Sequence, residues 1–193
     1  MSSSLVLGVG VNDRKYPMAV SRKHIKEYAI WYGFLLRCYS PRVQGKQPTY
    51  VGCSTSENFK SYSYFYRWCQ NQVGFGFQGF QLDKDLLIKG NKVYSEDNCL
   101  FLPQELNKLL ISSRACRGSL PIGVCISQNR FLAQYSIDSV SKHIGLFDTP
   151  EEAHNAYKKA KESHIKLQAE KWKDQIDIRA YEALMRYEVL STD

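Results

Sequence analysis

Residues 122–160 contain the pattern that most limits the possible fold. From Ile122 to Ser127 and from Arg130 to Ile137, β-forming residues alternate with polar ones, as they do in half-buried strands. Thr149 then precedes Pro150 and two glutamates, which is the usual cap, first-turn proline and acidic first turn of a helix. Small and apolar residues follow at helical spacing. The sequence therefore predicts short strands followed by a helix that packs closely on them.

The stretch from Arg117 to Ala160 carries a set of residues in a characteristic order: Gly123, Val124, Ala133, His143, Gly145, Phe147, Thr149, Glu151, Glu152, Ala153, Ala156, Tyr157 and Ala160. In these positions the stretch resembles the DNA-binding domain of the APETALA2 and ethylene-response-factor type. The resemblance implies a three-stranded antiparallel sheet packed on one helix, with double-stranded DNA as the partner.

One face of this sheet is expected to contact DNA. If Val124 and Leu132 face the helix, the opposite face is free for the major groove, which is wide enough for β-structure. By position we assign five residues to that face: Arg117, Gln128, Arg130, Gln134 and Lys142. Arg and Gln can make bidentate base contacts and Lys suits phosphate. The tryptophans typical of the plant domains are absent here, so the base preference stays open, and a solvated strand surface is the alternative.

A second motif lies upstream, in QLDKDLLIKGNKVYSEDNCLFLPQELN at residues 81–107. In spacing it resembles the phage homing endonucleases of the HNH family, whose ββα module holds one divalent metal on a scissile phosphate. The resemblance implies Mg²⁺ or Mn²⁺ bound by Asp83 and Asn107. It also implies a hairpin turn at Gly90 and Asn91 that Asn98 fixes by hydrogen bonds. Pro103 suits the first position of the helix that follows.

Lys84 departs from the HNH pattern, because it occupies the position of the general-base histidine. Lysine is a weak base near neutral pH, since its free side chain titrates near ~10.4. Carboxylates at Asp83 and Asp85 favour the charged ammonium, whereas a bound divalent cation disfavours it. The four histidines of the chain all lie outside this segment. Lys84 is therefore predicted either to activate water or to stabilise the phosphorane.

The basic charge of the chain is concentrated in two segments. The net charge is +7, and residues 1–60 hold nine Lys and Arg against three Asp and Glu, while residues 112–146 hold four against one. Residues 61–111 are balanced at five against five, and residues 147–193 are slightly acidic at eight against ten. This distribution favours a phosphate-tracking surface whose affinity falls steeply with salt.

Several classes of protein are disfavoured by composition. No apolar run approaches the ~20 residues of a membrane helix, and the N-terminal stretch does not read as a secretion signal. The six cysteines show no pair at zinc-finger spacing, so we expect no zinc site. We expect instead that the thiols are reduced and mostly buried. We expect a cytoplasmic protein; the resemblance adds that it acts in a bacterial host and is phage-encoded.

The predicted fold class is α+β. Helices are expected at Ser21–Cys38 and from Ser56 toward Gln72, then from Pro150 to near Trp172, with a last one from about Ile176 to Val189. Tyr62, Tyr64 and Tyr66 are candidates for phosphate or base contact. The predicted domains are 1–45 as helical support, 46–112 as the HNH-like module, 113–165 as the sheet domain and 166–193 as a helical extension.

Three functions remain open at this point. The first is a DNA-binding endonuclease that cuts or nicks duplex DNA with a divalent metal, using Asp83, Lys84 and Asn98 as its catalytic residues. The second is a non-cleaving relative that acts as a repressor or as a blocker of other DNA enzymes. The third is a protein-binding antagonist that reuses both modules as scaffolds.

Overall fold

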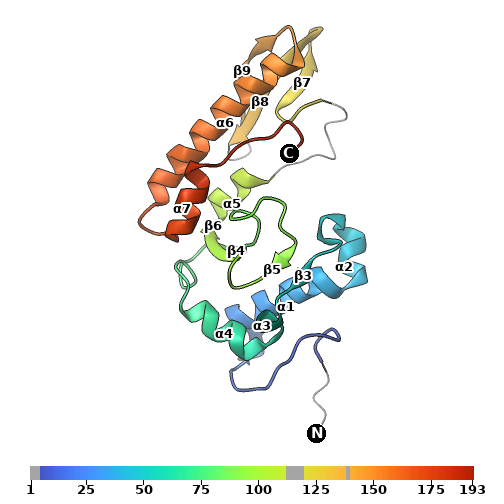
Figure 1. Ribbon diagram of the computed structural model, residues 1–193, viewed down its shortest axis with the longest axis vertical. Helices are drawn as coiled ribbons and strands as arrows, with labels where there is room; N and C mark the ends of the chain where they lie inside the picture. The colour runs from blue at the N-terminus through green and yellow to red at the C-terminus, as the bar shows by residue number, and fades with distance from the viewer. Residues whose placement is uncertain (1–4, 112–119, 138–139) are drawn as a thin grey trace. The chain divides into compact units, whose positions relative to one another are not determined.

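The computed structural model describes residues 5–111, 120–137 and 140–193, and it divides into two compact units, Met1–Pro103 and Gln104–Asp193 (Figure 1). The elements of the first unit are β1 Ala19–Val20, β2 Lys23–His24, α1 Lys26–Tyr39, α2 Pro41–Lys46, the 3₁₀ helix η1 Pro48–Tyr50, β3 Ser54–Thr55, α3 Glu57–Lys60, α4 Tyr62–Gln70, β4 Phe80–Asp83, β5 Val93–Tyr94 and β6 Leu100–Pro103. Those of the second are α5 Gln104–Leu110, β7 Val124–Ser127, β8 Arg130–Ile137, β9 Val140–Phe147, α6 Pro150–Trp172 and α7 Ile178–Met185. The chain is thus mixed α and β, as expected.

Helix α1 supplies much of the first core. Its buried residues are Tyr28, Trp31, Phe34, Leu35 and Cys38, which recur at helical spacing. The Trp31 indole donates a hydrogen bond to the Phe59 carbonyl (2.9 Å), and the Phe34 and Phe65 rings meet edge to face with centroids 5.1 Å apart. The helix begins at Lys26 and not at Ser21, because residues 19–24 form the β1–β2 hairpin instead.

The helix expected from Ser56 to Gln72 is broken into α3 and α4 at Ser61. Ser61 sits in extended backbone and its side chain caps α4 by accepting from the Tyr64 N–H (3.3 Å). The break is held by a distant strand-like contact, since the Val11 N–H donates to the Lys60 carbonyl and the Tyr62 N–H donates to the Val11 carbonyl, both at 2.9 Å. Local helix propensity is therefore overridden by a long-range backbone pairing.

The strand β4 pairs with β6 in antiparallel register, with Phe80 opposite Pro103 and Asp83 opposite Leu100. The expected hairpin with its turn at Gly90 and Asn91 is therefore wrong in detail. Those two residues lie inside a long connection, whose strand β5 pairs in parallel with β3 instead. Pro103 ends β6 and α5 begins one residue later, so proline precedes the helix rather than opening it.

The second unit contains the three-stranded antiparallel sheet expected from the sequence, in the order β7-β8-β9. Helix α6 runs beside these strands (Figure 1), and Val124, Ala133, Ala153 and Tyr157 form one buried cluster with Val189. Thr149 and Glu152 form a reciprocal capping box at the start of α6. The predicted helix end near Trp172 is also confirmed.

Gly123, which immediately precedes β7, lies close against Tyr157 of α6. Its φ is +79°, and a Cβ atom placed there would lie 2.1 Å from the ring of Tyr157. Only glycine combines this backbone conformation with so little space. The glycine of the sequence signature thus has a steric reason.

Cys38, Cys53, Cys69 and Cys99 are buried free thiols, and Cys125 is partly exposed. Burial raises the pKa of the Cys38 and Cys99 thiols to about 12. Among the helices of the described residues, none has both the length and the apolar character needed to cross a membrane.

Candidate functional site

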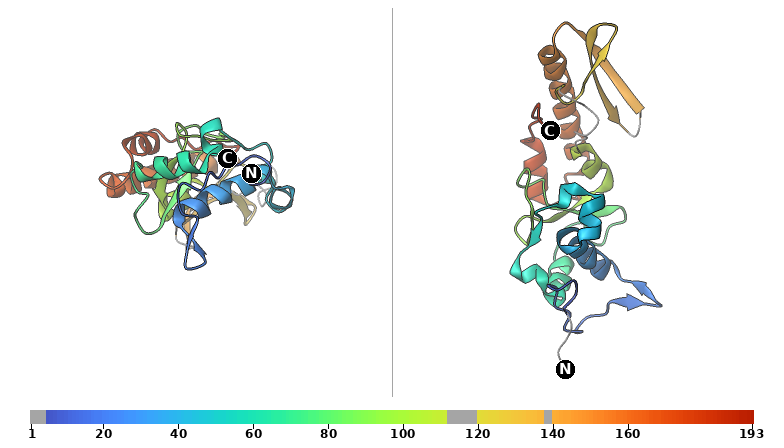
Figure 2. Two further views of the ribbon diagram at one scale, coloured as in Figure 1. Left: turned by 90° about the horizontal axis from the view of Figure 1, so that it is seen from below. Right: turned by 90° about the vertical axis from the view of Figure 1, so that its right-hand side faces the viewer.

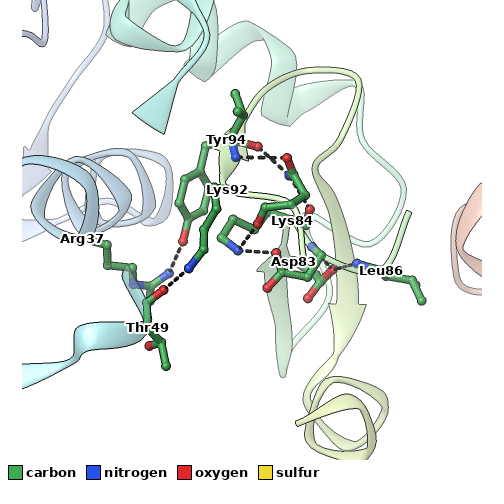
Figure 3. A network of polar contacts seen from close by, with 10 residues as sticks. Arg37, Thr49, Asp83, Lys84, Leu86, Lys92 and Tyr94 are labelled. Atoms are coloured by element: carbon green, nitrogen blue, oxygen red, sulfur yellow. Dashed lines mark hydrogen bonds and ion pairs between the residues drawn. The ribbon is translucent and has the colours of Figure 1, made fainter. Parts of the chain in front are cut away.

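Asp83 ends β4 and its carboxylate organises the start of the following connection. One oxygen, Oδ1, accepts the backbone N–H groups of Asp85 (2.9 Å) and Leu86 (2.8 Å), which makes a turn of the kind that Asp favours (Figure 3). Within the described residues, no hydrogen bond engages the second oxygen. The carboxylate is thus fixed in orientation by the backbone and retains ligand capacity.

The electrostatic surroundings of Asp83 disfavour its charge. Burial raises the pKa of this carboxyl above its usual value, and the like charge of Asp85 adds to the effect. The two backbone N–H groups and the Lys84 ammonium lower it only in part. The folded protein therefore disfavours an isolated negative charge on Asp83.

Lys84 is buried, at 8% exposure, and its ammonium points into the connection rather than to solvent (Figure 3). It donates to the Asp85 carboxylate and to the Asn91 carbonyl oxygen, the latter at 2.8 Å. It also lies 5.8 Å from the centroid of the buried Tyr94 ring. Lys84 therefore ties the two ends of the 84–91 segment together as a hydrogen-bond donor.

The role expected of Asn98 is performed by Asn91. The Asn91 side-chain Nδ2 donates to the Lys84 and Val93 carbonyl oxygens, both at 2.7 Å, while its Oδ1 accepts the Val93 N–H at 3.0 Å. Asn98 contributes its backbone N–H to Ser95 Oγ (3.2 Å). The position that fixes this connection is therefore seven residues earlier than the sequence pattern indicated.

The chemistry of the donor set limits what metal could bind. Asn107 lies on α5 in the second unit, whereas Asp83 belongs to the first, so their pairing stays a prediction from the sequence. Among the described residues, no three His, Cys, Asp or Glu side chains gather into a metal cluster. Mg²⁺ is often held by only one or two carboxylates together with water and substrate phosphates. Asp83 supplies one such carboxylate at the end of β4.

Strand register decides which residues of the sheet face away from α6. In β8 the rings of Phe131 and Tyr135 and the methyl group of Ala133 pack on the helix side. Leu132 pairs with Cys125 and alternates with these residues, so the expectation that it faces the helix is wrong. Arg130 and Gln134 fall on the same side as Leu132. We call the surface of Arg130, Leu132, Gln134, Ser141 and His143 the open face.

A β-bulge between Ala133 and Gln134 shifts the register with β9. As a result His143 lies opposite Gln134, while Lys142 lies opposite Tyr135, whose ring contacts Tyr157 of α6 at a centroid distance of 6.5 Å. Lys142 is exposed but does not share the open face, contrary to expectation. The bulge was not visible in the alternation of residue types.

The polar groups of the open face have few and weak partners. Arg130 pairs with Asp148 (Nη2 to Oδ1, 2.8 Å), and both side chains are largely exposed. Gln134 accepts from Ser141 Oγ at 3.2 Å and donates to Cys125 Sγ at 3.4 Å. Exchange of such contacts for a ligand costs little. Gln128 lies in the β7–β8 turn with φ +50°, and Arg117 lies outside the described residues.

The sequence did not predict His143 and Ser141 as open-face residues. Their side of the sheet follows from the β-bulge between Ala133 and Gln134, which shifts the register of β9. The sequence pattern also misplaced Tyr62, which is fully buried and donates its hydroxyl to the Pro17 carbonyl at 2.6 Å. Tyr64 and Tyr66 are partly exposed.

No family model, no curated protein and no solved structure matches this chain.

Proposed function

We propose that this protein binds double-stranded DNA through the open face of its three-stranded sheet. The observation that carries the proposal is the contrast between the two faces: one is packed on α6, and the other presents Arg130, Gln134 and His143. These side chains carry the donors and acceptors that read base edges in a major groove. The net charge of +7 favours the same partner.

For the HNH-like segment we propose a divalent metal site, Mg²⁺ or Mn²⁺, built on Asp83, with Asn107 as the second ligand predicted from the sequence. The bound metal would supply electrophilic activation of a phosphodiester. Asp83 would position it, since backbone N–H groups orient the carboxylate while one oxygen is left for coordination. On this proposal the protein cuts or nicks DNA.

A second candidate is a DNA-binding protein that does not cleave and acts as a repressor or a blocker of other DNA enzymes. The geometry of Lys84 favours it. An ammonium that already donates to Asp85 and to the Asn91 carbonyl has no lone pair with which to accept a proton from water. Water activation by Lys84 would require these contacts to break first.

The experiment that separates the two candidates compares the wild-type protein with Asp83→Asn. The amide retains an oxygen for the Asp85 and Leu86 N–H groups, so the turn is preserved while the charge is lost. Both proteins are incubated with supercoiled plasmid and Mg²⁺, Mn²⁺ or EDTA, and DNA binding is measured in parallel. Metal-dependent nicking that disappears in the variant supports the nuclease. Equal binding without nicking supports the non-cleaving candidate.

Absence of DNA binding at every salt concentration would contradict both candidates and leave the protein-binding antagonist.

A matched control for the nicking assay is Lys92→Met, which removes an exposed ammonium that is hydrogen-bonded to the Thr49 carbonyl in the same unit. It should leave nicking unchanged.

A further inference from the structure

The β1–β2 hairpin of the first unit is exposed along its whole length. Residues 17–24 are all exposed, and both views of Figure 2 show the hairpin, in blue, extending away from the helices of its unit. Val20 is 64% exposed and Met18 38%. The His24 ring of β2 meets the Tyr28 ring of α1 edge to face, with centroids 4.9 Å apart, and Asn12 Nδ2 donates to Met18 Sδ at 2.7 Å. A two-stranded ribbon is marginally stable by itself. Beyond these contacts the tip of the ribbon, residues 20–23, is exposed and available to a partner.

The base of the hairpin is anchored although its tip is free. The Tyr62 hydroxyl binds the Pro17 carbonyl (2.6 Å), and the Ile25 N–H donates to the Met18 carbonyl (3.0 Å). Beside it, the rings of Tyr16 and Tyr66 stack with centroids 4.1 Å apart. These contacts position the ribbon on the core of the first unit without covering it.

The turn of the hairpin carries charge at a conformational cost. Its central residues, Ser21 and Arg22, have φ values of +48° and +64°. Turns with two positive φ values strongly prefer Asn-Gly, because other residues pay roughly 1 kcal/mol in the left-handed region. Here the sequence places Arg22 at the tip and Lys23 next to it. Strain of this kind often accompanies function.

The two cations at the tip have no acidic partner in the part of the chain that the structure describes. By contrast, Lys15 pairs with Asp13 at 3.2 Å near the hairpin base. Arg22 and Lys23 are fully available to an external anion. Because they are adjacent on a narrow ribbon, they fit a regular array of negative charges.

We propose that the β1–β2 hairpin is a second DNA-binding element, which enters a groove of the duplex and contacts phosphates through Arg22 and Lys23. The inference rests on the proposed DNA-binding function but concerns a different surface. A major groove admits a two-stranded ribbon, and the exposed tip at residues 20–23 can approach the phosphates along its walls. The hairpin contributes affinity that depends on salt and not on sequence.

The test measures affinity for a short labelled duplex of arbitrary sequence by fluorescence anisotropy across a series of salt concentrations. The full chain is compared with the double variant Arg22→Ala/Lys23→Ala. Loss of two phosphate contacts lowers the slope of log affinity against log salt by about 1.8, and lowers affinity about 10- to 100-fold near 0.1 M salt. The matched control is Arg42→Ala/Lys46→Ala, which removes two exposed charges from α2 of the same unit. It should change the slope much less.

A second variant separates charge from folding. Ser21→Asn/Arg22→Gly gives the turn its preferred residues and removes one charge, so the hairpin is retained while DNA affinity still falls.

Equal losses of DNA affinity in the hairpin and α2 double-alanine variants would overturn the proposal in favour of a diffuse charge effect. Unchanged DNA affinity in the hairpin variant, with loss of binding to anionic phospholipid vesicles, would overturn it in favour of a membrane surface. If the wild-type chain binds no duplex, the proposed function fails with it; if it binds and the hairpin variant matches it, only this inference fails.

Discussion

The 83–99 connection and the open face of the sheet both carry the polar residues that motif positions predict, but they use them in opposite ways. In the connection, the buried Lys84 ammonium donates to the Asp85 carboxylate and to the Asn91 carbonyl, and the Asn91 side chain donates to the Lys84 carbonyl. On the open face, Arg130 and Gln134 make few side-chain contacts, which are exposed or part-buried. The first region is built to hold its own shape, and the second leaves its polar groups ready for exchange.

This difference shows that residue type at a motif position is not enough to assign a role. A lysine in place of a general base can be a reactive group or a structural tie, and the direction of its hydrogen bonds distinguishes the two. Variants in the two regions should therefore differ in kind: in the connection they should act mainly on stability, and on the open face mainly on binding.

The largest effect is expected from Gly123→Ala in the second unit, compared with Gly90→Ala in the connection. Both glycines have φ near +75°, at +79° and +75°, but only the Cβ at Gly123 would meet the Tyr157 ring. Gly123→Ala should cost about 3 kcal/mol or more of unfolding free energy, through strain and overlap together. Gly90→Ala should cost about 1 kcal/mol. Urea unfolding followed by circular dichroism measures both, and equal losses would argue against the close approach of sheet and helix.

The next effect is expected from Lys84→Met. Removal of the buried ammonium leaves the Asn91 carbonyl without its donor, which should cost about 2 kcal/mol. The exposed Lys92→Met serves as the control and should cost less than about 0.5 kcal/mol. The comparison uses thermal unfolding of both variants. A loss for Lys84→Met no greater than for Lys92→Met would remove the structural role and restore Lys84 as a catalytic candidate.

Open-face variants should change binding with little loss of stability. Arg130→Ala and His143→Ala should each weaken DNA affinity about 10-fold, since a good base contact contributes roughly 1–3 kcal/mol of discrimination. Lys142→Ala should weaken it less, because the bulge turns Lys142 toward the helix side. Anisotropy titrations at one fixed salt concentration give the order. Should Lys142→Ala prove the most harmful, the register would not describe the DNA-bound surface.

The smallest effect concerns the pH dependence contributed by Asp83. Burial raises the pKa of this carboxyl in the folded state, so protonated Asp83 favours the folded protein. Its contribution to the free energy of unfolding is complete below the unfolded pKa near ~3.9 and is lost as pH rises through the raised pKa. Asp83→Asn lacks this loss, so it should be more stable than wild type at neutral pH and equal to it in acid.

Thermal unfolding at several pH values, with and without Mn²⁺, measures the difference. A metal that binds Asp83 should reverse the order at neutral pH by stabilising the wild type alone. A Mn²⁺ effect of the same size in both proteins would place the metal elsewhere.

Much of the second unit could be read from the sequence because its signals are local. Thr149, Pro150 and Glu152 cap a helix through contacts within one turn, and the alternation in residues 124–137 reports a half-buried sheet directly. The candidate residues of the first unit were harder to interpret, since the burial of Lys84 depends on Asn91 and on Tyr94, whose strand pairs with β3.

The sequence by itself determined where α6 begins and ends and that two strands precede it, while the third strand was implied by the family resemblance. Only the tertiary structure decided that Val11 interrupts the helix at Ser61, that a bulge separates Lys142 from the open face, and that Lys84 points inward. The physical reason is the range of the interactions. Caps and alternation act between residues a few positions apart, whereas strand pairing and burial join residues distant in the chain and override local preference.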